Sequence, residues 1–61
     1  MTLPPEILLT LEQVAARLQI SPRSVQRHVA EGRIPVVRIG RLLRFRPADI
    51  ELFIRQSVQL R

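Results

Sequence analysis

Residues 10–32 read TLEQVAARLQISPRSVQRHVAEG, and this stretch contains two helix start signals in close succession. Thr10 and Gln13 form a capping-box pattern, in which each side chain bonds to the backbone amide of the other residue at a helix start. A first helix is therefore predicted to begin at Leu11. Its apolar residues recur at the helical period and define one buried face: Leu11, Val14, Ala15 and Leu18.

The second start signal is Ser21 followed by Pro22, because serine caps helices and proline is favoured at the first helical position. This helix is predicted to run from Pro22 to about Glu31, where Gly32 provides a left-handed stop. Two short helices joined by about three residues must cross at a steep angle, which is the helix-turn-helix arrangement. Gln19 lies in this turn, and a left-handed glutamine there would cost roughly 1 kcal/mol relative to glycine.

Residues 36–45 (VVRIGRLLRF) alternate apolar and cationic side chains on both sides of Gly40, which predicts two short strands joined by a turn. We expect one face of this hairpin to cover the helices, because a two-stranded hairpin is not stable alone. Arg38 and Arg44 are expected to share the opposite face, with Arg41 near the tip. The side chains expected on the covered face are Val37, Ile39, Leu43 and Phe45.

Pro47 begins a third predicted helix, whose buried stripe consists of Ile50, Phe53 and Ile54. The predicted order is helix, helix, two-stranded wing, helix. The expected fold class is therefore α+β, mostly α, with the architecture of a winged helix-turn-helix. We expect this domain to span residues 9–57, between an N-terminal arm at 1–8 and a C-terminal tail at 58–61.

Positive charge is concentrated in the middle of the chain. The 61 residues include ten cationic side chains, all arginine, and five acidic ones, which gives a net charge of +5. Residues 22–46 hold seven of the arginines and one glutamate, so this block alone has a net charge of +6. A cationic block of this density in a small domain predicts an anionic partner and favours nucleic acid.

The composition also excludes several classes of protein. Cysteine is absent, so disulfides and thiolate metal sites are excluded. We expect a soluble cytoplasmic protein, because there is no apolar run of about 18 residues and no basic region that begins a signal peptide. No enzyme activity is expected, since no nucleophile and base are available as a pair. His28, the one histidine, is interpreted as a packing residue, and neither a metal nor a cofactor is expected.

Five segments resemble, in order and spacing, the small winged helix-turn-helix domains of the excisionase and MerR-like superfamily. They are LLTLEQVA (8–15), ISPRSVQR (20–27), GRIP (32–35), VRIGR (37–41) and RFRPADI (44–50). The resemblance implies that the second helix enters the major groove of DNA and that the wing lies along the backbone or the adjacent minor groove. Two departures are Leu43, where the family often has tryptophan, and His28, at a position that is usually apolar.

The second helix is expected to bury Val25 and Val29, so the opposite face is free to read bases. The residues on that face, which also match the base-reading positions of the family, are Arg23, Gln26 and Arg27. The residues expected to contact the DNA backbone are Ser21, Ser24, Arg33 and Arg46. The wing residues expected on phosphates or in the minor groove are Arg38, Arg41 and Arg44. The alternative for the base-reading group is a solvated helix face, and Ser21 would then be simply a helix cap. The alternative for the wing arginines is a set of edge-strand charges that aids solubility.

The sequence thus predicts a sequence-specific duplex-DNA-binding protein of the excisionase type, either an architectural recombination factor or a small transcriptional regulator. A single module of this size contacts little DNA, so tandem or dimeric binding is expected, and a recombinase is a candidate partner. The apolar residues available for such protein contacts are Leu3, Ile7, Leu52, Val58 and Leu60. The alternative is a protein-interaction module that uses the helix-turn-helix as a scaffold for a recombinase or terminase. RNA and membrane surfaces are disfavoured, because the chain lacks exposed aromatic platforms and interfacial aromatic residues.

Overall fold

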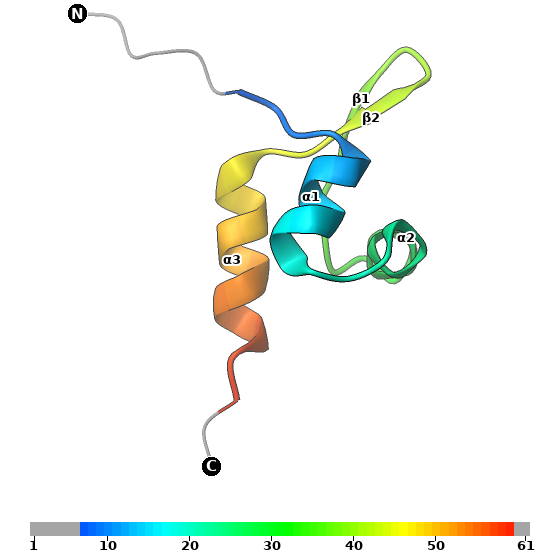
Figure 1. Cartoon of the computed structure of the whole chain (residues 1–61). Helices are drawn as coiled ribbons and strands as arrows, with labels where there is room; N and C mark the ends of the chain where they lie inside the picture. The colour runs from blue at the N-terminus through cyan, green and yellow to red at the C-terminus, as the bar shows by residue number, and fades with distance from the viewer. Residues whose placement is uncertain (1–6, 60–61) are drawn as a thin grey trace, which may run out of the picture.

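A computed structural model describes residues 7–59, which form three helices and a two-stranded antiparallel sheet. Along the chain the elements are α1 (Leu11–Leu18), α2 (Pro22–Ala30), β1 (Val37–Ile39), β2 (Leu42–Arg44) and α3 (Pro47–Ser57). The predicted order and the winged helix-turn-helix architecture are confirmed. In Figure 1, α1 lies between α2 and α3, and the hairpin projects from the helices on the same side as α2. Most of the expected arm, part of the expected tail, and Leu3 and Leu60 lie outside the described residues.

Both helices of the helix-turn-helix begin with the capping groups that the sequence predicts. Thr10 Oγ1 accepts a hydrogen bond from the Gln13 amide at 3.1 Å, and Gln13 Oε1 accepts one from the Thr10 amide at 2.8 Å. Ser21 Oγ accepts a hydrogen bond from the Ser24 amide at 3.1 Å, and Pro22 occupies the first helical position. These bonds satisfy amides that a helix leaves without an internal acceptor, so both starts are determined locally.

The end of α1 is a Schellman motif built on a glutamine. Gln19 adopts a left-handed backbone with φ 57° and ψ 43°. Its amide donates to the Ala16 carbonyl at 3.2 Å, and the Ile20 amide donates to the Ala15 carbonyl at 3.1 Å. These two bonds satisfy carbonyls that the last turn of a helix leaves free. The left-handed conformation considered for Gln19 from the sequence is therefore present, in a residue with a Cβ that disfavours it.

The end of α2 has the same motif, with glycine at the left-handed position. Gly32 has φ 77°, its amide donates to the Val29 carbonyl at 3.0 Å, and the Arg33 amide donates to the His28 carbonyl at 2.9 Å. The predicted left-handed glycine stop is confirmed. The last helical residue is Ala30, one position before the predicted end, because the capping residue that follows no longer has helical geometry.

The wing has a two-residue turn. The strand register that this turn sets differs from the prediction in which side chains lie on each face of the hairpin. Gly40 has φ 60° and Arg41 does not have a positive φ, which is the pattern of a type II′ hairpin turn. The strand partners are Val37 with Arg44, Arg38 with Leu43, and Ile39 with Leu42. Directly opposite residues share a face of a sheet. Arg38 and Arg44 therefore lie on opposite faces of the wing, and the expectation that they share one was wrong.

The same register explains why Ile39 does not cover the helices. Leu43 shares a face with Arg38 and is half-buried, whereas Ile39 shares the other face with Leu42. Ile39 is 51% exposed and Leu42 is 53% exposed. The predicted burial of Ile39 was therefore wrong.

A small core joins all three helices to the base of the wing. Its fully buried side chains are Val14, Ala15, Val25, Ile34, Phe45 and Ile50. Half-buried apolar residues surround them: Leu9, Leu11, Leu18, Ile20, Val29, Val36, Phe53 and Ile54. The predicted stripes of α1 and α3 are confirmed. Ile34, which is 2% exposed in the segment between α2 and β1, was not predicted to be buried, because no helical or strand period includes it.

Two further contacts tie distant parts of the chain together. Leu9 pairs with Phe45 in an isolated antiparallel bridge, in which each amide donates to the carbonyl of the other residue at 2.8 Å. An ion pair between Arg17 of α1 and Glu51 of α3 joins these two helices at the surface. None of the helices within residues 7–59 has the length and apolar character needed to cross a membrane.

Candidate nucleic-acid interface

The outer face of α2 carries all three side chains that were predicted to read bases. Arg23, Gln26 and Arg27 are exposed, while Val25 on the opposite face is completely buried and Val29 is half-buried. Residues three and four positions apart on a helix have Cβ atoms about 5–6 Å apart, so these three groups are neighbours. Two guanidinium groups and one amide therefore lie together on the face of α2 that is not packed in the core.

An open groove of about 310 Å³ lies between α2 and the wing. The residues that line it are Leu11, Gln26, Val29, Ala30, Arg38, Leu43 and Phe45. Gln26 comes from α2 and Arg38 from β1, so a ligand in the groove would meet polar groups from both elements. The sequence assigned Gln26 and Arg38 to separate groups. It did not predict the groove, because the face to which Arg38 belongs depends on the register of the wing.

The N-terminus of α2 leaves one backbone amide and one hydroxyl hydrogen available as donors. Ser21 Oγ and Ser24 Oγ are hydrogen-bonded to each other at 3.0 Å. The Ser24 amide donates to Ser21 Oγ and the Val25 amide to the Ser21 carbonyl at 3.1 Å, while Pro22 has no amide hydrogen. Within the described chain, the Arg23 amide is the one amide of this first turn without an acceptor. Such a donor at a helix start, with hydroxyl groups beside it, suits an anionic oxygen.

The three arginines of the wing do not form one cluster. Arg38 lines the groove beside α2, and Arg41 is exposed in the turn at the tip. Arg44 lies on the other face and is half-buried, with Nη1 donating to the Leu43 carbonyl at 2.7 Å. The wing therefore presents positive charge along its whole outline, and only Arg38 is directed toward the groove.

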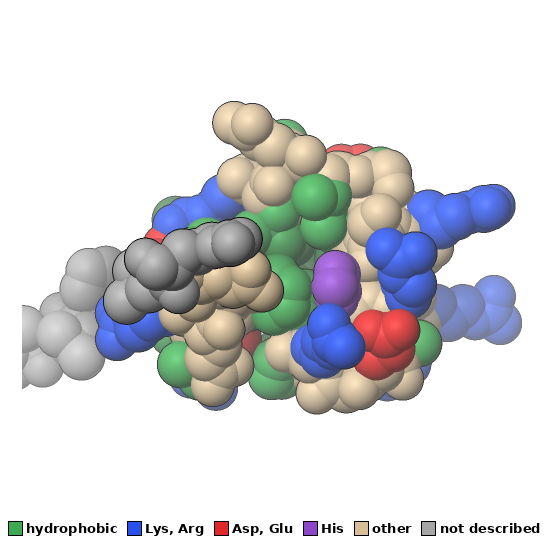
Figure 2. Space-filling view, turned by 90° about the horizontal axis from the view of Figure 1, so that it is seen from below, with side chains coloured by type: hydrophobic (Ala, Val, Ile, Leu, Met, Phe, Trp, Pro, Cys, Tyr) green, Lys and Arg blue, Asp and Glu red, His purple; other side chains and the backbone are tan. Residues whose placement is uncertain are grey.

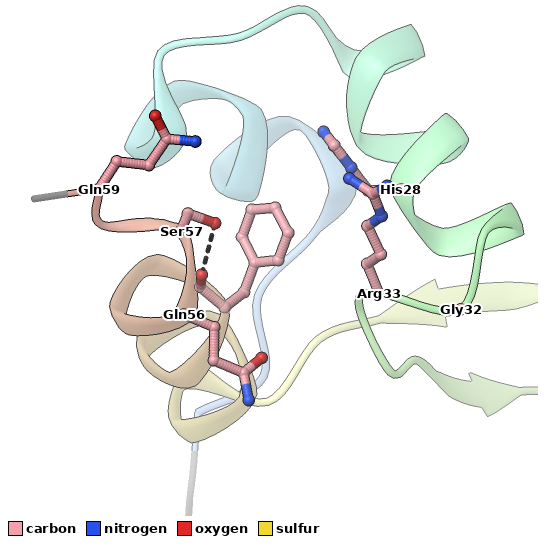
Figure 3. Close-up of a pocket in the computed structure, with 7 residues that line it drawn as sticks. His28, Gly32, Arg33, Gln56, Ser57 and Gln59 are labelled. Carbon is pink, nitrogen blue, oxygen red and sulfur yellow. Dashed lines mark hydrogen bonds between the residues drawn. The ribbon is translucent and has the colours of Figure 1, made fainter.

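A second cavity, of about 630 Å³, lies between the C-terminal ends of α2 and α3. Figure 3 shows His28 and Arg33 on one side of it and Gln56, Ser57 and Gln59 on the other. Arg33 thus lies away from the α2–wing groove, and its Nε is 3.5 Å from a carboxylate oxygen of Glu31. The fold does not bring this predicted phosphate contact together with the others.

Arg46 and His28 occupy structural positions as well. The Arg46 carbonyl accepts hydrogen bonds from the Asp49 and Ile50 amides at 3.0 and 3.2 Å, so this residue caps α3. His28 packs its ring against Phe53, with centroids 5.1 Å apart and an angle of 58° between the rings. Its Nδ1 is buried and has no hydrogen-bond partner within the described residues. Figure 2 shows the imidazole at the molecular surface, between apolar side chains and charged ones.

The described residues contain no cluster of three or more histidine, cysteine or carboxylate side chains that would hold a metal ion. In a comparison with known protein families, the family described as "Helix-turn-helix domain" matches residues 8–58 of the 61-residue chain. The match includes α1, α2, both strands of the wing and α3. Neither the comparison with curated proteins nor the comparison with solved structures found a match.

Proposed function

Because the chain belongs to the helix-turn-helix domain family, which binds DNA, we propose that it is a sequence-specific duplex-DNA-binding protein of the excisionase type. In this proposal α2 lies in the major groove and the wing lies along the adjacent backbone or minor groove. The protein acts by binding and shaping DNA, either to direct recombination or to regulate a promoter. It performs no catalytic step of its own.

The observation that carries this proposal is the polar face of α2 beside the wing groove. Arg23 and Arg27 each have a planar fork of donors that matches the O6 and N7 acceptors of guanine, and Gln26 matches the acceptor and donor of adenine. A major groove about 12 Å wide admits one α-helix. With α2 in that groove, Gln26 faces base edges and Arg38 faces the sugar-phosphate wall beside them.

The contacts to phosphate in this proposal come from the start of α2 and from the wing. At the start of α2, the Arg23 amide with the Ser21 and Ser24 hydroxyls would hold one phosphate. Arg38 and Arg41 of the wing would neutralise others. Arg33, Arg44 and Arg46 are not assigned a phosphate in this arrangement, because each has a structural role or lies away from the groove. Their contacts with DNA stay predictions from the sequence.

The test of base reading is a charge-preserving substitution. A duplex is first selected from a random library by the wild-type protein, and binding is then compared with a scrambled duplex. Arg27→Lys keeps the charge but loses the planar fork, so it should reduce the preference for the selected duplex about 5- to 150-fold and leave binding to the scrambled duplex unchanged. Equal losses on both duplexes would mean that Arg27 contacts only the backbone. A wild-type protein that prefers no sequence would refute specific recognition.

The test of phosphate contact is the dependence of the binding constant on salt. If five or six phosphates are neutralised, the plot of log K against log salt concentration should have a slope of about −5. Arg41→Ala should reduce that slope by about 1. Arg55→Ala is the matched control: it removes the same charge from an exposed site on α3, on the far side of α1 from α2, and should leave the slope unchanged. A slope near zero would contradict DNA binding and favour the protein-interaction module instead.

The excisionase-type role adds the requirement that several copies act together. One winged module buries about 600–1,000 Å² of protein surface on DNA, so high affinity needs adjacent copies or a partner such as a recombinase. Three apolar side chains that the structure describes as exposed are available for such contacts: Ile7, Leu52 and Val58. Footprinting on the DNA that flanks the gene should therefore give protection at two or more repeated sites. Protection of one isolated site would favour a simple regulator.

A further inference from the structure

The wing tip exposes a pair of apolar side chains that the fold does not use. Ile39 and Leu42 are directly opposite each other across the hairpin and flank the two-residue turn. They are 51% and 53% exposed, and their pairing across the hairpin puts the two exposed aliphatic side chains side by side. Neither belongs to the core cluster or to the side chains packed around it. This pair, which we call the tip pair, lies outside the core of the domain.

The charged residues around the tip pair indicate the charge of a partner that would bind there. Arg41 is exposed in the turn between the two residues, Arg38 precedes Ile39, and Arg44 lies on the same face of the hairpin as the pair. No acidic side chain occurs between residues 32 and 48. A partner of the tip therefore offers apolar surface with negative charge on both sides of it. The minor groove of a DNA duplex has this composition, because deoxyribose rings and base edges form its floor and walls and phosphates form its rims.

The direction in which the hairpin projects agrees with that partner. The wing extends beyond the helices on the side of α2, and the tip is its most distant point (Figure 1). Strands of three residues place the turn about 10 Å from the base of the hairpin. With α2 in the major groove, as proposed, the projecting tip is the part of the wing expected to meet the adjacent minor groove.

We infer that the tip pair is a wedge that enters the minor groove and opens a base step, which bends the DNA. The inference rests on the proposed DNA-binding function. Two strands about 4.8 Å apart, with side chains outside them, are too wide for a B-form minor groove of about 6 Å. The tip can enter only where the groove opens, and apolar side chains inserted at a base step open it and bend the helix by about 20–90°. Pyrimidine–purine steps, which unstack most easily, are the expected sites.

The experiment measures bending on a duplex that contains one selected site. Fluorophores at the two ends report the bend by energy transfer, and 2-aminopurine placed successively along the minor-groove contact reports unstacking. The variant Ile39→Ser/Leu42→Ser should bind about tenfold more weakly, should lose at least half of the bend at saturating protein, and should lose the 2-aminopurine signal. Gln56→Ser is the control, because it shortens a neutral, exposed side chain on α3 to the same serine. Circular dichroism and thermal melting confirm that the variants are folded.

Each outcome decides the inference. Loss of both the bend and the 2-aminopurine signal in the tip variant, with both retained in Gln56→Ser, supports it. An unchanged bend in the tip variant overturns it, even if affinity falls, because the pair is then a contact and not a wedge. Wild-type binding without any bend also overturns it. Loss of cooperativity on two-site DNA with normal bending on one site overturns it in favour of contacts between copies. If the wild-type protein does not bind DNA at all, the proposed function itself has failed, which is a distinct result.

Discussion

Replacing Gln19 by glycine should stabilise the domain. The two helices of the helix-turn-helix end in the same motif, but the left-handed residue is a glutamine in the first and a glycine in the second. Gln19 and Gly32 both adopt a left-handed backbone, with φ of 57° and 77°. In both motifs the amide of this residue and the amide that follows it donate to carbonyls of the preceding helix. The Gln19 side chain is exposed and makes no hydrogen bond within the described residues, so its removal costs no contact.

The size of the effect follows from two opposing terms. A left-handed residue with a Cβ costs about 1–2 kcal/mol relative to glycine. Glycine also increases the conformational entropy of the unfolded chain, which offsets about 0.4–1 kcal/mol of the gain in stability. Gln19→Gly should therefore raise the free energy of unfolding by about 0.5–1 kcal/mol, or the melting temperature by about 2–8 °C for a domain of this size. Gly32→Ala should lower the free energy by a similar amount, since a Cβ at Gly32 meets no atom within 4 Å and only the backbone term changes.

Urea denaturation followed by circular dichroism measures both changes. Gln19→Ala serves as the control, because it keeps the Cβ and should stay within about 0.5 kcal/mol of the wild type. Affinity for the selected duplex should not change in any of the three variants, because both positions lie at helix ends away from the polar face of α2. If Gln19→Gly is neutral or destabilising while Gly32→Ala is destabilising, the turn is not strained at Gln19 and the reasoning is refuted.

Three further predictions concern the contacts that hold the elements together. Thr10→Ala removes one half of the capping box and should lower the free energy of unfolding by about 1 kcal/mol in urea titrations; no change would mean that Gln13 alone suffices. Phe45→Ala leaves a cavity at the centre of the core and should lower the free energy of unfolding by about 3–5 kcal/mol. This loss is close to the whole free energy of unfolding, about 3–9 kcal/mol, expected for 61 residues. The far-ultraviolet circular dichroism spectrum of the variant should therefore be that of an unfolded chain. A double-mutant cycle of Arg17→Ala and Glu51→Ala should give a coupling below about 1 kcal/mol that weakens further in high salt, because both side chains are about half-exposed; a larger coupling would contradict a surface ion pair.

The parts of the fold that the sequence predicts correctly are those determined by neighbouring residues. Thr10 with Gln13 and Ser21 with Pro22 locate two helix starts, since each cap closes within one turn of the chain. Gly32 locates a helix end for the same reason. Apolar periodicity then identifies the buried faces of α1 and α3, because every helix repeats its face at a fixed interval.

The faces of the wing were predicted incorrectly because they depend on how two strands are aligned. Alternation within a strand separates its own two faces, but it does not say which face of one strand matches which face of the other. The two-residue turn at Gly40 aligns Ile39 with Leu42, and this places Arg38 and Arg44 on opposite sides. Counting the turn residues would have identified this alignment from the sequence.

The remaining features depend on contacts between residues distant in the chain. Ile34 is buried because the segment after α2 returns to the core, and no local pattern indicates that return. The groove that brings Gln26 next to Arg38 likewise depends on how the wing docks on α2. The predicted base-reading residues share one face because a single helix carries them, whereas the predicted phosphate contacts come from six different segments and are dispersed.

The bridge between Leu9 and Phe45 has a consequence for motion. Its two backbone hydrogen bonds join residues 36 positions apart and close a loop that contains α1, α2 and the wing, with α3 outside it. Closing so long a loop is entropically costly, and an isolated pair of hydrogen bonds has no neighbouring ladder to support it. In native-state hydrogen exchange, these two amides should therefore open before those of α1 and α2. Each opening is expected to loosen the backbone at the base of the wing, while the fully buried Phe45 side chain keeps that base packed in the core.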